Sequence, residues 1–157
     1  MVPNEYEHRQ TGRVVVALVA LAAILPLRHF VFAAASRDAS VLTPLAVVAL
    51  LVLLVVGVLF SSLTIQVLHG HLMWSLGPGF FRHMLPLERI RDVQVRDNPW
   101  LQGLGIRKRD GVRGYAVAGG SAVEIELEDG ERIRLGTDDP EGLVRALRES
   151  DADGLYR

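Results

Sequence analysis

A long uncharged segment dominates the hydrophobic pattern of this chain. Residues 39–65 contain no charged side chain, and Val41–Phe60 consists almost wholly of leucine, valine and alanine. Twenty residues of helix rise about 30 Å, which is the thickness of the hydrocarbon core of a bilayer. Pro44 falls in the first turn, where its missing N–H is harmless. The pattern therefore predicts a transmembrane helix over about 41–61.

A second apolar segment precedes this helix and is less uniform. Arg28 and His29 interrupt the apolar pattern of residues 14–35. We interpret this segment as another membrane helix, with a kink caused by Pro26. The short connection 36–40 then makes the two helices antiparallel neighbours, so both ends of the hairpin lie on one side of the membrane.

The first segment has an alternative interpretation as a cleaved signal peptide, because Ala33–Ser36 offers the small residues of a cleavage site. Arg28 and His29 stand just before that site, in a part of a signal peptide that is normally apolar, so we favour the hairpin. The pair itself is either an ion or lipid contact site or an interfacial anchor. We favour the anchor; a hairpin that oligomerises around Arg28 and His29 would instead form a small transport or channel-like assembly.

From Leu63 onward the hydrophobic period changes from helical to two, which predicts β-strands. The clearest strand is 122–128, in which three apolar residues alternate with three glutamates. Turn residues such as Gly77-Pro78-Gly79 separate the strands. Apolar residues that suit strands occur at eight places, from which we expect about seven short strands: 63–67, 72–76, 80–85, 93–95, 106, 115–117, 122–128 and 133–135.

The last hairpin of this β region turns at Asp129-Gly130. An odd-length loop or a bulge near Gly130 keeps apolar residues on one face of both strands. The expected pairs are Leu127 with Ile133, Glu126 with Arg134 and Glu128 with Arg132. Glu124, Glu126 and Glu128 then form a solvent face rather than a carboxylate site.

A C-terminal helix is expected to close the domain. Asp139 is a good N-cap and Pro140 a good first helical residue, and an apolar stripe follows at helical spacing. The predicted helix covers 140–149. Residues 1–13 and 150–157 are read as tails, and Trp100 is expected to fold back over the core.

Several short motifs occur together in the β region: Pro86-Leu87, Asn98-Pro99-Trp100, Gly114-Tyr115, Asp129-Gly130 and, most specifically, Gly136-Thr137-Asp138-Asp139-Pro140-Glu141. Through them, residues 63–149 resemble the pleckstrin-homology-like (PH-like) domain of bacterial membrane proteins in which a two-helix hairpin comes first. The resemblance implies a membrane α-helical hairpin plus a small α+β domain. That domain would be a partly open antiparallel β-barrel of about seven strands, capped by the C-terminal α-helix.

The same resemblance implies a multi-pass protein of the bacterial plasma (inner) membrane, with the domain and both termini on the cytoplasmic side. It implies no enzyme activity and no cofactor. The expected role is a membrane-anchored interaction or scaffolding module, whose partners are the lipid bilayer and a protein or a second copy. The open edge of a β domain suits strand addition.

Composition narrows the chemistry further. The net charge of −1 gives no basic signal for nucleic acid, and the absence of cysteine excludes disulfides, thiolate metal sites and cysteine catalysis. His69 and His71 are the tightest histidine pair, but no nearby acid completes a metal site, so we expect an ordinary polar turn. No motif for catalysis or for binding a phosphate or dinucleotide cofactor is present.

Arg107, Lys108, Arg109 and Arg113 form the densest basic cluster. Segment 82–113 carries eight lysines and arginines against four acids, whereas segment 121–153 carries eleven acids against four arginines. This distribution predicts an electrically two-faced domain, and one interpretation is that its basic loops contact anionic lipid headgroups. Such a contact contributes about 1 kcal/mol per basic residue near the surface. The alternative is a solvated β surface with local ion pairs.

Overall fold

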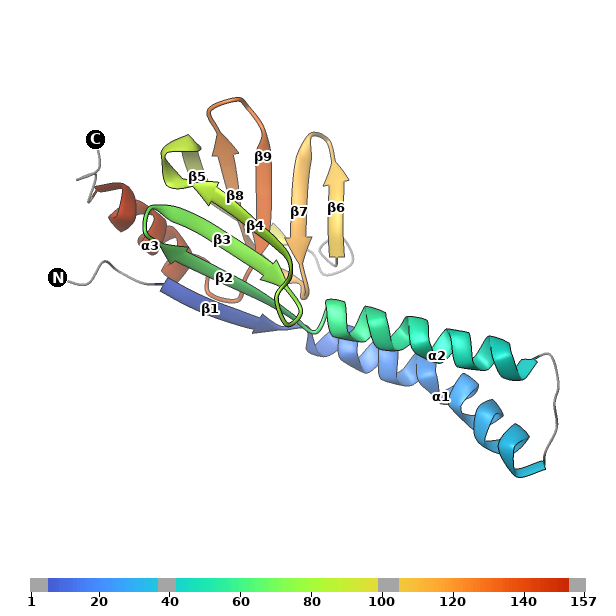
Figure 1. Ribbon diagram of the computed structural model, residues 1–157. Coiled ribbons are helices and arrows are strands. Elements are labelled where there is room, and N and C mark those ends of the chain that lie inside the picture. Colours follow the sequence, from blue (N-terminus) through green and yellow to red (C-terminus); the bar gives the residue numbers. More distant parts are fainter. Residues whose placement is uncertain (1–5, 37–41, 99–104, 153–157) are drawn as a thin grey trace.

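The computed structural model describes residues 6–36, 42–98 and 105–152. Two apolar helices, α1 (Arg13–Ser36) and α2 (Leu42–Leu59), project together from one end of a β-rich domain (Figure 1). The eighteen residues of α2 rise about 27 Å, close to the thickness of a hydrocarbon core. Both helices are long and apolar enough to cross a membrane, as the sequence predicts.

Small residues bring the two helices together. A Cβ atom added at Gly57 of α2 would lie 3.3 Å from Cγ1 of Val19 on α1, so the glycine permits a close approach. Ala33 and Ala46 are the buried residues of the pair. Pro26 lies inside α1, and α1 diverges from α2 toward its far end in Figure 1. Residues 37–40 of the connection expected between the two helices lie outside the described residues.

The first sheet contains four antiparallel strands in the order β1-β2-β3-β4. Their bounds are Tyr6–Thr11, Ser62–Leu68, His71–Leu76 and Phe80–Pro86. The assignment of residues 1–13 to a tail was therefore wrong, because Tyr6–Thr11 pairs with β2 along its whole length. This strand turns Tyr6, His8 and Gln10 toward the side of the sheet that carries the core, so its pattern lacks apolar alternation.

The second sheet has the order β5-β8-β9-β7-β6. Its strands are Ile90–Asn98, Gly120–Leu127, Arg132–Gly136, Val112–Ala116 and Gly105–Arg109. The β7–β9 pair is parallel and the other neighbours are antiparallel. The described residues thus form nine strands in two sheets, not about seven in a wholly antiparallel arrangement. A 3₁₀ turn, Leu87–Arg89, joins the sheets.

The core lies between the two sheets, and helix α3 (Pro140–Ala152) packs against it. Leu143 and Leu147 of α3 are buried, and α3 lies at the end of the domain remote from α1 and α2 (Figure 1). The helix begins at Pro140 as predicted and is longer than the predicted 140–149. Trp100 lies outside the described residues.

The β8–β9 hairpin confirms the expected odd-length loop but not the expected pairs. Gly130 has φ +80° and closes a three-residue loop, with the Leu127 N–H donating to the Glu131 carbonyl at 2.9 Å. The loop has the predicted odd length, but each β8 residue pairs with the β9 residue two positions before the predicted one. The observed pairs are Ile125 with Ile133, Glu124 with Arg134 and Glu126 with Arg132.

The helices join the β domain almost without linkers. Only Gly12 separates β1 from α1, and only Phe60 and Ser61 separate α2 from β2. The Gly12 N–H donates to the Ser61 carbonyl at 2.8 Å, so a hydrogen bond joins the β1–α1 connection to the α2–β2 connection. The domain is therefore placed directly at the ends of the helices.

Candidate anion-binding cleft

Four arginines converge on the outer face of the second sheet. They come from β6 (Arg107 and Arg109) and from β9 (Arg132 and Arg134), with β7 lying between these strands. On β7, Gly114 pairs with both Arg107 and Arg134, and Val112 pairs with both Arg109 and Arg132. Directly paired residues of neighbouring strands point to the same face of a sheet. The register therefore aligns all four side chains on the face that points away from the core.

These arginines line a cleft of about 420 Å³ whose lining includes three glycines, Gly105, Gly114 and Gly136. The only atom near the Cβ position of Gly114 is the Arg107 carbonyl oxygen, at 4.0 Å. Glycine is not needed there for close packing of the chain. Its missing side chain leaves space between the two arginine pairs.

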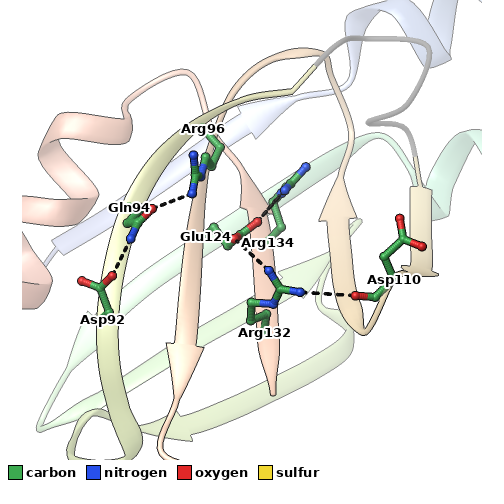
Figure 2. A network of polar contacts seen from close by, with 7 residues as sticks. All are labelled: Asp92, Gln94, Arg96, Asp110, Glu124, Arg132 and Arg134. Atoms are coloured by element: carbon green, nitrogen blue, oxygen red, sulfur yellow. Dashed lines mark hydrogen bonds and ion pairs between the residues drawn. The ribbon is translucent and has the colours of Figure 1, made fainter. Parts of the chain in front are cut away.

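Glu124 of β8 holds the β9 arginines at the edge of this cleft (Figure 2). Nε and Nη2 of Arg134 both donate to Oε2 of Glu124, the former at 3.1 Å, and Nη1 of Arg132 lies 3.9 Å from Oε1. Glu124 lies on the outer face of the sheet, as predicted, but its side chain is only 11 % exposed because the two arginines cover it. The shared carboxylate fixes the positions of two guanidinium groups before any ligand arrives.

The cleft carries an excess of positive charge. Among the described residues, Asp110 is the only acidic one that lines it, and Asp110 Oδ2 lies 3.5 Å from Nε of Arg109. The Asp110 carbonyl accepts a bond from Nη2 of Arg132 at 3.4 Å (Figure 2). When Glu124, which lies behind the cleft, is counted with Asp110, the described residues place four guanidinium groups beside two carboxylates. Guanidinium groups in such a setting suit phosphate and carboxylate ligands, which they bind through two parallel hydrogen bonds.

A polar ladder on β5 continues the same face of the sheet (Figure 2). Arg96 donates to the Gln94 side-chain oxygen at 2.7 Å, and Gln94 donates to Oδ2 of Asp92 at 2.7 Å. This hydrogen bond from Gln94 is the main cause that lowers the pKa of Asp92 below its ordinary value. The outer face is thus polar from β5 across to β6.

The structure divides the basic cluster that the sequence singled out. Arg107 and Arg109 line the cleft, whereas Lys108 and Arg113 pair with each other on the opposite face. Arg113 forms an ion pair with Glu131 there. The basic segment 82–113 and the acidic segment 121–153 therefore do not form two separate faces of the domain.

Sequence reasoning missed Arg132 and Arg134, because they belong to the acidic segment of the chain. A signal was present: two arginines at alternate positions of a strand, as in Arg107 and Arg109. Strand pairing across β7 was needed to bring the two pairs together.

One end of the cleft lies next to the apolar helices. Gly105 begins β6, and its Cβ position lies 3.8 Å from Cε1 of Phe60, the residue that follows α2. In Figure 1 the β6–β7 hairpin is the part of the second sheet nearest α2.

The remaining predicted residues lie elsewhere. Arg28 is exposed on α1, whereas Nε2 of His29 is buried without a hydrogen-bond partner among the described residues. His69 and Gly70 both have positive φ and form a two-residue turn, and Nδ1 of His71 lies 2.9 Å from the His69 carbonyl oxygen. The described residues contain no group of three or more potential metal ligands.

Comparison with known proteins found no family model, no curated protein and no solved structure that matches this chain. The geometry of the cleft and the position of its Gly105 end beside α2 are therefore the features that bear on function.

Proposed function

We propose that this chain is a non-enzymatic, membrane-anchored PH-like interaction module that binds anionic lipid headgroups in the cleft between β6 and β9. The observation that carries the proposal is the convergence of Arg107, Arg109, Arg132 and Arg134 around Gly114. The two helices anchor the module in the plasma membrane as a hairpin, with the domain and both termini on the cytoplasmic side.

The pairing of β1 supports a retained hairpin over a cleaved signal peptide. Cleavage after Ala35 would release Tyr6–Thr11 and leave β2 without its neighbour at the edge of the first sheet. An unpaired strand edge invites aggregation. The packing of Val19 against Gly57 also supports two helices that remain together.

The chemistry of the cleft favours a phosphate-bearing headgroup. Two of the guanidinium groups are already oriented by Glu124, and the adjacent arginines come from the strand nearest the membrane side of the domain. A phosphodiester brings the negative charge and the planar pair of oxygens that a guanidinium binds best. Zwitterionic lipids offer the same phosphate with a cation attached, so a net positive cleft discriminates against them.

The test is native mass spectrometry of the full chain in a non-ionic detergent, with equal amounts of phosphatidylglycerol and phosphatidylcholine added. We expect the native chain to retain phosphatidylglycerol preferentially. The double variant Arg107→Gln/Arg109→Gln should lose that preference.

The matched control is Lys108→Gln/Arg113→Gln, which removes the same charge from the same hairpin but on the other face of the sheet. We expect the control to keep the preference. If both double variants lose the preference for phosphatidylglycerol equally, the preference comes from general charge attraction. If neither variant loses it, the cleft does not bind the headgroup.

His29 favours a second candidate function, a subunit of a small transport or channel-like assembly. Its Nε2 is buried within the apolar hairpin and has no hydrogen-bond partner among the described residues, and polar atoms in such a place are costly and commonly functional. Association through this site predicts a defined oligomer of the full chain that His29→Leu disperses. A monomer in native mass spectra would count against this candidate.

A further inference from the structure

We infer that the turn joining β3 to β4 and the first two residues of β4 form a membrane-interface wedge, in which Phe80 and Phe81 enter the bilayer beside the end of α2. The inference rests on the proposed membrane placement of α1 and α2, but not on lipid binding in the arginine cleft. Its occupant is the interfacial layer of the bilayer itself.

The first observation is where the turn lies. The Cβ position of Gly77 is 2.7 Å from the Val58 carbonyl oxygen and 3.2 Å from that of Leu59, so the turn touches the last residues of α2. The Gly77 N–H also donates to the Ser62 carbonyl at 2.7 Å. Because α2 is about as long as the hydrocarbon core is thick, its last turn lies at the bilayer boundary. The β3–β4 turn is seen beside this junction in Figure 1.

The second observation is exposed apolar surface at this place. Phe80 is 52 % exposed and Phe81 is 54 % exposed, although both are large aromatic side chains. Outside α1 and α2, the described residues have only a few other exposed large apolar side chains: Met84, Val95 and Ile106. Two phenylalanines that are adjacent in the sequence are thus each about half exposed, and exposed aromatic surface of this size favours an apolar contact. A membrane interface is the surface that already borders this turn.

The third observation is the backbone that presents Phe81. The β3–β4 register shifts by one residue, so that Phe81 and Arg82 both fall opposite Ser75. Phe81 has φ +50°, which is uncommon for a bulky side chain. A bulge of this kind redirects a side chain relative to the regular strand. The Phe81 backbone is thus strained although its phenyl ring gains little burial within the domain.

The fourth observation is a pair of arginines, Arg9 and Arg82, near the junction of the β domain with α2. Nη2 of Arg82 lies 3.1 Å from the Cβ position of Gly79, so the guanidinium folds back over the turn. Nη2 of Arg9 donates to Oγ of Ser62, close after α2, at 3.2 Å. Both arginines line one hollow of about 560 Å³ on the outer face of the first sheet. Aromatic rings beside cations match the boundary between acyl chains and phosphate groups.

The test uses spin labels, because the sequence contains no cysteine and each single-cysteine variant carries one label. The full chain with Phe81→Cys is reconstituted into vesicles of phosphatidylcholine alone. Power-saturation measurements then compare collisions with oxygen, which dissolves in the bilayer, and with a nickel chelate, which stays in water. We expect several-fold greater preference for oxygen at position 81 than at an aqueous position.

Two further variants fix the scale. His69→Cys lies at the β2–β3 turn, at the opposite end of the same strands, and should favour the nickel chelate. Val52→Cys lies in the middle of α2 and should favour oxygen. If position 52 favours the chelate, the membrane placement itself fails, and the proposed function fails with it.

The remaining outcomes decide on the wedge alone. If position 52 favours oxygen and position 81 favours the nickel chelate, Phe81 is in water and the inference is overturned. If position 81 is protected from both reagents, Phe81 is covered by protein, which points to a second copy and also overturns the inference. Because the vesicles carry no anionic lipid, a failure of headgroup binding in the cleft does not alter these readings.

Discussion

The phenol oxygen of Tyr6 lies 3.2 Å from Oδ2 of Asp139, across 133 residues of sequence. Asp139 is also the N-cap of α3, because its Oδ1 accepts a bond from the Gly142 N–H at 3.0 Å. One carboxylate therefore joins β1, which precedes the apolar hairpin, to α3, which ends the domain. The β domain is assembled from chain on both sides of α1 and α2.

This contact predicts a stability that depends on pH above neutrality. Burial is the main cause that raises the pKa of Tyr6 above its ordinary value of about 10, and the Asp139 carboxylate adds to it. The folded chain thus retains the phenol proton after the unfolded chain has lost it. The free energy of unfolding should fall as the pH rises above 10, and Tyr6→Phe should flatten this fall.

Thermal unfolding followed by circular dichroism between pH 8 and about pH 11 tests this dependence. At pH 8 the variant should be destabilised by about 0.5–1.5 kcal/mol, the net contribution of one hydrogen bond. The native chain and Tyr6→Phe losing stability in parallel as the pH rises would contradict the assignment to Tyr6.

Removal of residues 1–11 should destabilise the β domain although it leaves all the other strands in place. The deletion exposes β2 as a sheet edge and withdraws Tyr6 from its packing against the core. Burial of one large side chain contributes about 1.5–3 kcal/mol, so we expect a loss of at least about 2 kcal/mol. Urea unfolding of the chain with and without the deletion measures this loss, and equal midpoints would contradict the role of β1.

Much of the fold was predictable wherever one face of a segment is apolar. The two apolar helices, the alternation in β2, β3 and β8, and the start of α3 at Pro140 all follow from hydrophobic period and capping. β1 was not predictable in this way, because Tyr6, His8 and Gln10 occupy its inward positions. Tyr6 and His8 have hydrogen-bond partners in Asp139 and Asp138, which lie far away in the sequence and come near only in the folded chain.

The cleft was predictable in part. Arg107 and Arg109 were found because they are close in sequence, whereas Arg132 and Arg134 needed the parallel pairing of β7 with β9. Parallel neighbours leave no local turn signal in the sequence. The covering of Glu124 by two arginines was not predictable for the same reason, since it depends on the neighbours of Glu124 across the sheet.

Gly12→Ala should disturb the junction between the helices and the sheets. A Cβ at Gly12 would overlap the Phe60 carbonyl oxygen, and backbone atoms cannot move aside as a side-chain tip can. We expect a destabilisation of about 1–3 kcal/mol, as for overpacked sites. Gly114→Ala is the matched control, because its nearest neighbour is at 4.0 Å. A Gly12 variant as stable as the control would show that the junction is loosely packed.

Glu124→Gln should strengthen anion binding while weakening the fold. The carboxylate competes with a ligand for Arg132 and Arg134, and its neutralisation also adds one net positive charge beside the cleft. We expect a gain of about 1 kcal/mol, roughly fivefold in retention of phosphatidylglycerol. Loss of charged hydrogen bonds should cost about 1–3 kcal/mol in the free energy of unfolding.

Glu126→Gln is the matched control for this substitution, since it makes the same change on the same strand and face. Glu126 lies opposite Arg132 in the register but does not itself line the cleft, and its side chain is 39 % exposed and forms its ion pair with Arg91 of β5, at 3.5 Å. The control should leave lipid retention almost unchanged. Weaker retention by Glu124→Gln would mean that the carboxylate positions the arginines more than it competes for them, and would contradict the prediction.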